Sequence, residues 1–106
     1  MGLYAVNYEY VDDPARLAEV RPAHRLHLEQ LFKSGSLIAS GPLGGVGAEE
    51  APRPAGALLI VEANYPDEAL EILDADPFWI AGLITHRDAR AWTLIYGAFS
   101  PPPTTP

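Results

Sequence analysis

The sequence contains no cysteine, which excludes a disulfide framework, a thiolate nucleophile, a zinc–thiolate site and an iron–sulfur cluster. Basic residues are also scarce: 7 lysines and arginines stand against 14 aspartates and glutamates, a formal net charge of −7. Nucleic acids and anionic membrane surfaces are therefore not expected as partners, because both attract basic surfaces. No apolar run approaches the ~20 residues of a spanning helix, and no signal-peptide pattern opens the sequence. We expect a cytoplasmic protein.

The chain nevertheless holds enough apolar material for one folded domain. Hydrophobic residues make up 48% of its 106 residues, which supports a core and excludes full disorder. At this length one domain is expected rather than two. Ser100–Pro106 consists mainly of proline and small polar residues. We therefore expect a domain over residues 1–99 and a flexible tail over residues 100–106.

Four segments are predicted as β-strands. In Leu3–Val11 every second residue from Tyr4 to Tyr10 is apolar, which gives the strand one aromatic face. Ala57–Ala63 contains a continuous apolar run that is typical of a strand buried on both faces. The other two expected strands are Ser36–Ser40, ended by Gly41-Pro42, and His86–Tyr96.

Two helices are expected between these strands. Pro22–Ser34 begins with a proline, which needs no donor at the first helical position, and Gly35 is suited to a left-handed C-terminal cap. We expect Pro22 to break any continuation from a short helical turn at Ala15–Val20. The second helix is expected after an N-cap at Asn64. The remaining expectations are a Gly- and Pro-rich loop at Leu43–Gly56 and an apolar turn at Phe78–Leu83.

The predicted order is strand, helix, strand, strand, helix, strand. This order matches the βαββαβ ferredoxin-like arrangement, an α+β fold whose four-stranded antiparallel sheet carries two helices on one face. Apolar residues are nevertheless available for both faces of the sheet. We therefore expect a homodimer, in which a second copy covers the face without helices.

His24 is the first residue that suggests chemistry. It shares an apolar helical stripe with His27, Leu28 and Leu31, and such a histidine is often a packed core residue. The alternative is a general acid or base, which needs an orienting carboxylate. Asp74 and Asp76 both qualify, because each lies in a loop that ends a helix. The residues alone leave both interpretations open.

Other chemistries receive less support. His24 and His27 are one helical turn apart, but a third ligand from Glu29, His86 or a loop aspartate would not have a zinc-type spacing. No metal site is therefore predicted. Gly41–Gly47 lacks the Lys-Ser/Thr and the following helix of a phosphate-binding loop. Without a metal cluster or a dinucleotide fingerprint, no cofactor is expected.

Three segments together resemble the YciI-like (YCII-related domain) family. They are Arg21-Pro22-Ala23-His24, Ser40-Gly41-Pro42-Leu43 and Asp74-Ala75-Asp76-Pro77-Phe78. The resemblance runs from about Leu3 to Trp92. It implies a ferredoxin-like fold that dimerises sheet against sheet, akin to the dimeric α/β barrels.

The resemblance also implies a site. A histidine and an aspartate form a catalytic pair in the family, and these correspond to His24 and Asp76. The family implies that Arg21, Ser40, Gly41 and Phe78 lie nearby. We expect an apolar wall formed by Phe78, by Tyr4 or Tyr8, and by Trp79.

Relatives with muconolactone-isomerase-like or dehydrochlorinating activities imply a cofactor-independent lyase or isomerase for small cyclic or aromatic-derived metabolites. His24 would move a proton, and Asp76 would hold its tautomer. The alternatives are a non-catalytic dimer that binds or senses a small molecule, and a structural dimer that assists a partner.

Overall fold

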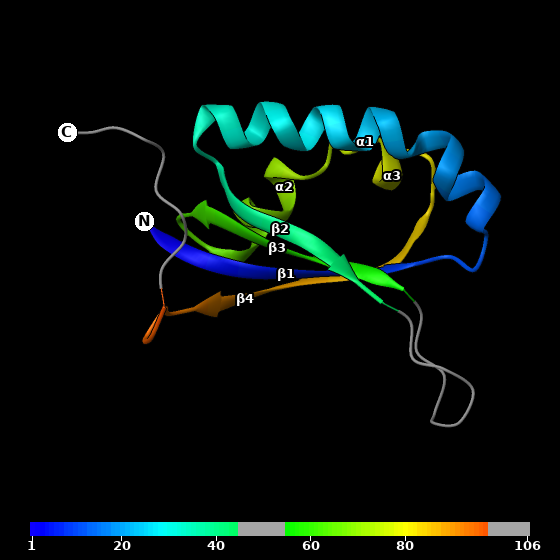
Figure 1. The fold of residues 1–106 in the computed structure, drawn as a ribbon. Coiled ribbons are helices and arrows are strands. Elements are labelled where there is room, and N and C mark those ends of the chain that lie inside the picture. The colour runs from blue at the N-terminus through cyan, green and yellow to red at the C-terminus, as the bar shows by residue number, and fades with distance from the viewer. Residues whose placement is uncertain (45–54, 98–106) are drawn as a thin grey trace, which may run out of the picture.

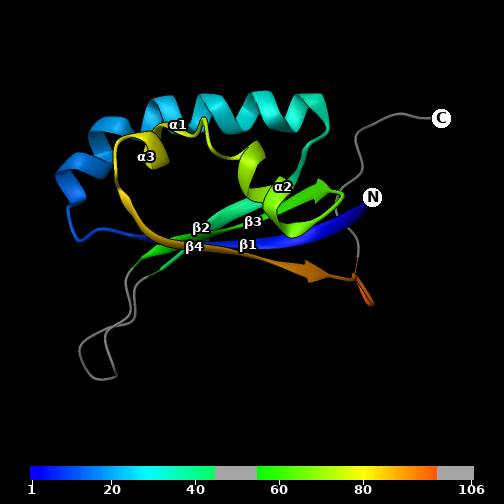
Figure 2. The ribbon, with the colours of Figure 1, turned by 180° about the vertical axis from the view of Figure 1, so that it is seen from behind.

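The computed structural model describes residues 1–44 and 55–97, and these adopt the predicted ferredoxin-like α+β fold. Four strands form one antiparallel sheet in the order β2-β3-β1-β4, with the helices on one face (Figure 1, Figure 2). The elements are β1 (Gly2–Tyr10), α1 (Pro14–Ser34), β2 (Leu37–Leu43), β3 (Gly56–Ala63), α2 (Pro66–Ile72), α3 (Pro77–Ile80) and β4 (Ile84–Trp92). The predicted order of elements is confirmed, with α3 as the additional apolar turn.

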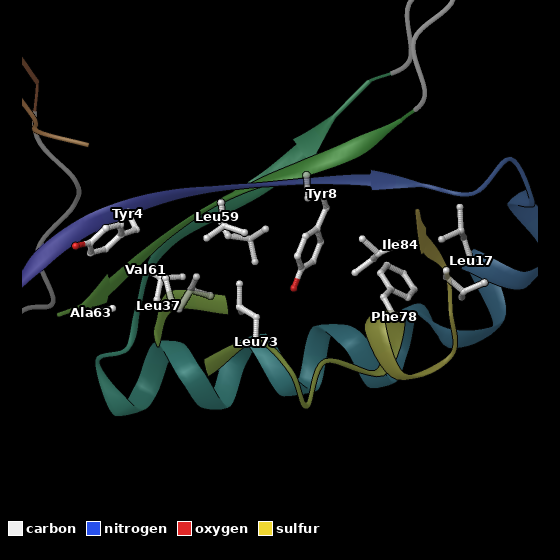
Figure 3. Close-up of a cluster of buried hydrophobic side chains, with 14 residues drawn as sticks. Tyr4, Tyr8, Leu17, Leu37, Leu59, Val61, Ala63, Leu73, Phe78 and Ile84 are labelled. Carbon is white, nitrogen blue, oxygen red and sulfur yellow. The ribbon is translucent and has the colours of Figure 1, made fainter. Parts of the chain in front are cut away.

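β1 lies between β3 and β4, and its aromatic face points toward the helices. Val6 is fully buried, and Tyr8 is only 1% exposed. Figure 3 shows the ring of Tyr8 reaching from β1 toward the helical layer. The aromatic stripe predicted from the sequence therefore belongs to the core of this chain.

The core fills the space between the sheet and the helices (Figure 3). Leu59 and Val61 of β3 meet Leu73, which follows α2, and all three side chains are fully buried. Each large apolar side chain removed from water in this way stabilises the fold by about 1.5–3 kcal/mol. The core thereby anchors α2 and the chain that leads into α3.

α1 is continuous across Pro22, so the predicted break at that residue is wrong. The helix begins earlier because Asp13 caps it, with the Asp13 side chain accepting a hydrogen bond of 3.1 Å from the Arg16 N–H. Pro14 takes the first helical position. Pro22 removes only its own donor, and the first turns of α1 run at an angle to the rest of the helix (Figure 1). The predicted left-handed cap at Gly35 is confirmed, with φ of 90°.

β2 does not end before Gly41-Pro42 as predicted but continues to Leu43. The sheet order explains the difference, since β2 is an edge strand whose outer side needs no donor. β4 ends at Trp92 rather than at Tyr96, because Trp92 pairs with Leu3 near the start of β1. Beyond that pair, β1 offers almost no further partner residues.

The N-cap of α2 is Tyr65 and not Asn64. Pro66 fixes the first helical position, so the cap falls on the residue before it. Asn64 contacts the helix in another way, because its backbone N–H donates to the Glu68 carboxylate at 2.8 Å. The Glu68 side chain of α2 therefore satisfies the backbone N–H of Asn64, the residue before the N-cap.

The face of the sheet opposite the helices, called the outer face below, is not covered by any described helix (Figure 1, Figure 2). Part of it forms a shallow, mainly apolar groove of about 360 Å³. The groove is lined by Ala5, residues 39–43, Leu58, Ile60 and Trp92. Dimerisation through this face stays a prediction.

None of the described helices is long and apolar enough to cross a membrane. The predicted tail, the predicted domain boundary at residue 99 and residues 45–54 of the predicted loop lie outside the described residues.

Candidate functional site

Asp76 is a fully buried carboxylate at the start of α3. It is the N-cap of this one-turn helix, and its Oδ1 accepts a hydrogen bond of 3.0 Å from the Phe78 N–H. The Asp-Pro-Phe sequence favours this geometry, because aspartate is a preferred N-cap and proline suits the first helical position. The local turn therefore fixes the direction of the carboxylate.

His24 of α1 meets this carboxylate from across the helical layer. Its Nδ1 lies 2.8 Å from Asp76 Oδ1, and the imidazole stacks on the Phe78 ring at 4.1 Å between centroids and 13° between planes. A carboxylate accepts the hydrogen bond, so Nδ1 carries the proton, and the neutral ring then has its lone pair on Nε2. Among the described residues, no hydrogen bond engages Nε2.

Tyr8 holds the other oxygen of the same carboxylate. Its hydroxyl donates to Asp76 Oδ2 at 2.9 Å, so the Asp76 carboxylate accepts three hydrogen bonds. Burial raises the pKa of Tyr8 far above its usual range, and the charge of Asp76 raises that pKa further. The Tyr8 hydroxyl therefore remains a donor throughout the physiological pH range.

The two candidate aspartates have different environments. Asp74 binds the guanidinium of Arg87, which also lies 3.6 Å above the ring of Trp79 and donates to the Leu70 carbonyl. Of the two carboxylates that the sequence left open, Asp76 is the one beside His24. Trp79 packs against Arg87, the partner of Asp74.

A cavity of about 460 Å³ opens beside His24, between α1 and the sheet. Four residues that the family resemblance places near the pair line it, namely Arg21, Ser40, Gly41 and Phe78. Tyr8 does not line it, because it lies behind Asp76 and is almost fully buried. The structure thus brings most of the expected site residues to one cavity. Tyr8 instead binds the Asp76 carboxylate from the buried side.

Sequence reasoning missed two polar residues of the cavity wall, Tyr10 and Arg25. Tyr10 packs edge-on against Phe78, with 5.2 Å between the ring centroids and 73° between the planes. A signal was available for Tyr10, because it continues the period-two stripe of β1 beyond Tyr8. Arg25 follows His24 in sequence, and no pattern distinguished it from a solvated helix face.

The pKa of Tyr10 is raised to about 12, chiefly by burial and then by the charge of Asp76, while Arg21 acts in the opposite direction. The hydroxyl of Tyr10 is therefore protonated near neutral pH and available as a donor at the cavity.

His27 has a different position from His24. It is partly buried, does not line the cavity, and its Nε2 has no hydrogen-bond partner among the described residues. Those residues also contain no group of three or more histidines and carboxylates arranged to hold a metal ion.

The sheet, the one-sided helices and the cavity between them define a small ferredoxin-like α+β domain with an interior site. Its sequence matches the YCII-related domain over residues 3–93. The chain belongs to this family.

Two curated relatives and one solved structure resemble the chain. Protein YciI of Escherichia coli O6:H1 (strain CFT073) and Protein YciI of Shigella flexneri are each 30% identical over 93 residues, which cover 82% of this chain and 95% of the relative. The solved structure is the 5-chloro-2-hydroxyhydroquinone dehydrochlorinase TftG from Burkholderia phenoliruptrix AC1100, in complex with 2,5-dihydroxybenzoquinone. It is 26% identical, with a TM-score of 0.68 over 86% of this chain and 93% of that one.

Proposed function

We propose that this chain is a cofactor-independent enzyme of the lyase or isomerase type that acts on a small cyclic or aromatic-derived metabolite. The observation that carries the proposal is the buried His24–Asp76 hydrogen bond at the wall of a cavity large enough for one ring compound. The likeness to a dehydrochlorinase supports this class of reaction.

In this mechanism His24 moves the proton. Asp76 holds the Nδ1–H tautomer and stabilises the imidazolium that forms when Nε2 takes a proton from the substrate. The same nitrogen then returns the proton to another atom of the substrate or to a leaving group. Phe78 keeps the imidazole in plane by stacking, and Tyr8 acts as a positioning residue for Asp76.

The other residues at the cavity bind the substrate. Arg21, Ser40 and the Gly41 backbone offer polar contacts, and Phe78 provides an apolar surface. A second copy of the chain on the outer face completes the proposed functional unit, because that face carries an apolar groove without a described helix over it.

The test uses 5-chloro-2-hydroxyhydroquinone and follows chloride release and the quinone absorbance, with 2,5-dihydroxybenzoquinone as a binding probe. We expect turnover that His24→Gln and Asp76→Asn each lower by about 100-fold or more, the range in which general acid–base catalysis contributes. His27→Gln, on the same helix, is the matched control and should keep its activity.

Full activity in His24→Gln would refute the role of the histidine. Binding of 2,5-dihydroxybenzoquinone at the cavity without turnover would instead support the alternative, a dimer that binds or senses a small molecule. Circular dichroism of each variant shows whether the fold survives the substitution.

A further inference from the structure

The cavity beside His24 has the opposite charge to the rest of the chain. Acidic residues outnumber basic ones 14 to 7 in the sequence. Yet two arginines, Arg21 and Arg25, line the cavity, and no aspartate or glutamate does so among the described residues. A site that concentrates positive charge in an acidic protein attracts anions and repels cations.

Neither arginine is neutralised by the part of the chain that the structure describes. Elsewhere on α1 the basic side chains have partners: Arg16 lies 3.4 Å from Glu19, and Lys33 lies 3.5 Å from Glu29. Glu29 is one turn beyond Arg25, yet it pairs with Lys33.

Arg21 and Arg25 are four residues apart on one helix, so their like charges repel each other across one turn of α1. An anion bound between the two guanidinium groups would remove this repulsion.

The negative charge nearest the site does not compete for the arginines. Both oxygens of Asp76 already accept hydrogen bonds, and the residue is fully buried. Tyr10 adds a protonated hydroxyl to the same wall. The polar wall therefore offers donors, while Leu28 and Leu59 make another part of the cavity apolar.

We infer that the ligand of this cavity is an organic anion, a small apolar body with a carboxylate, phenolate or enolate oxygen held by Arg21 and Arg25. The inference rests on the proposed function only in taking this cavity as the ligand site. It fixes the charge of the ligand, which the proposed reaction class leaves open. Arginine suits the task because its planar group donates two parallel hydrogen bonds to such oxygens.

The test compares benzoate, benzamide and benzylammonium, three probes of similar shape that differ in charge. Each is titrated into ¹⁵N-labelled protein, and the amide signals of Ser40, Gly41 and Gly44 report on the cavity. Benzoate should bind about tenfold more tightly than benzamide, because hydrogen bonds to a charged group are roughly twice as strong. Benzylammonium should not shift these signals, and added salt should weaken benzoate.

Variants of Arg21 and Arg25 test whether these side chains hold the anion. Arg25→Gln should weaken benzoate by about fivefold to tenfold, the worth of one exposed charge-assisted contact, and leave benzamide unchanged. Arg21→Gln should act in the same direction. The matched control is Arg90→Gln, which removes the same charge from an exposed residue of β4 that does not line the cavity.

Three results would each overturn the inference. Benzamide could bind as tightly as benzoate, Arg25→Gln could bind benzoate as tightly as Arg90→Gln does, or benzoate could leave the cavity amide signals unshifted. These results leave the proposed reaction class untouched. That proposal fails on a separate measurement, the persistence of turnover in His24→Gln.

Discussion

A single carboxylate connects three elements of the fold at the scale of individual residues. Asp76 begins α3, binds His24 of α1 and accepts from Tyr8 of β1. A buried carboxylate is costly without such partners, and each of its donors would be left unpaired if it were lost. The local stability of the site and the orientation of the histidine therefore depend on the same contacts.

The two tyrosines beside Asp76 predict a loss of stability in alkali. Both have a pKa raised above 10, to about 12 for Tyr10, so the unfolded chain releases these protons first. Stability that is fully present below pH 10 should therefore fall as pH rises through 10 toward 12. The free energy of unfolding should drop by up to about 1.4 kcal/mol per pH unit for each tyrosine.

Urea unfolding at several pH values measures this slope. Tyr8→Phe and Tyr10→Phe should each reduce it, and Tyr65→Phe, at an exposed tyrosine, is the control. An alkaline slope that stays the same in Tyr8→Phe and in Tyr10→Phe would contradict the interpretation.

At the scale of elements, the start of β3 packs tightly against the backbone of β1 at Tyr8. A Cβ atom on Gly56 would lie 1.9 Å from the carbonyl oxygen of Tyr8, so only glycine fits there without a shift of the backbone. Tyr8 in turn holds Asp76. Gly56, at the start of β3, thus allows Tyr8 to keep the position from which it binds Asp76.

Gly56→Ala should destabilise the protein by about 1–3 kcal/mol, the usual cost of forcing extra volume into a packed region. Denaturant unfolding measures the loss. Gly41→Ala, on β2, has no atom within 4 Å of its added Cβ and is the matched control. A Gly56→Ala variant as stable as Gly41→Ala would show that β1 yields easily at Tyr8.

Much of this architecture could be predicted from local patterns. Short-range rules account for the period-two stripe of β1, the cap at Gly35 and the order of strands and helices along the chain. They also account for the choice of His24 as a candidate. The break at Pro22 was wrong because the helix has an earlier cap at Asp13. The end of β4 at Trp92 depends on where its neighbour β1 starts, which is tertiary information.

The residues that line the cavity were harder to predict than the His24–Asp76 pair. Tyr10 and Arg25 reach it only because α1 crosses the sheet at a certain place, and no spacing in the sequence encodes that crossing. Choosing Asp76 over Asp74 likewise required the family resemblance, since both aspartates end a helix in the sequence. The pattern predicted the residue types, and packing decided which of them meet.

At the scale of the whole molecule, we expect the outer face to govern association. Leu58 is 37% exposed within the apolar groove of that face. Stable dimers bury about 1,200–2,000 Å² in total. We predict a homodimer of twice the 11.5 kDa chain mass, visible by light scattering at micromolar concentration.

Leu58→Glu should shift this dimer toward the monomer, because a charge would be buried at the interface. Ile80→Glu is the matched control, since Ile80 is 71% exposed on the helical side of the molecule. A wild-type chain that scatters as a monomer would refute the dimer, and an unchanged Leu58→Glu dimer would move its interface elsewhere.

The two edges of the sheet bear on a different property, resistance to polymerisation. An open strand edge is a template on which another chain can add a strand, and runaway addition produces fibrils. On β2, Pro42 has no N–H to offer an incoming strand. On β4, Asp88 and Arg90 put charges along the strand. Growth at either edge is therefore disfavoured, which leaves the faces of the sheet as the places where copies can meet and still form a closed, finite particle.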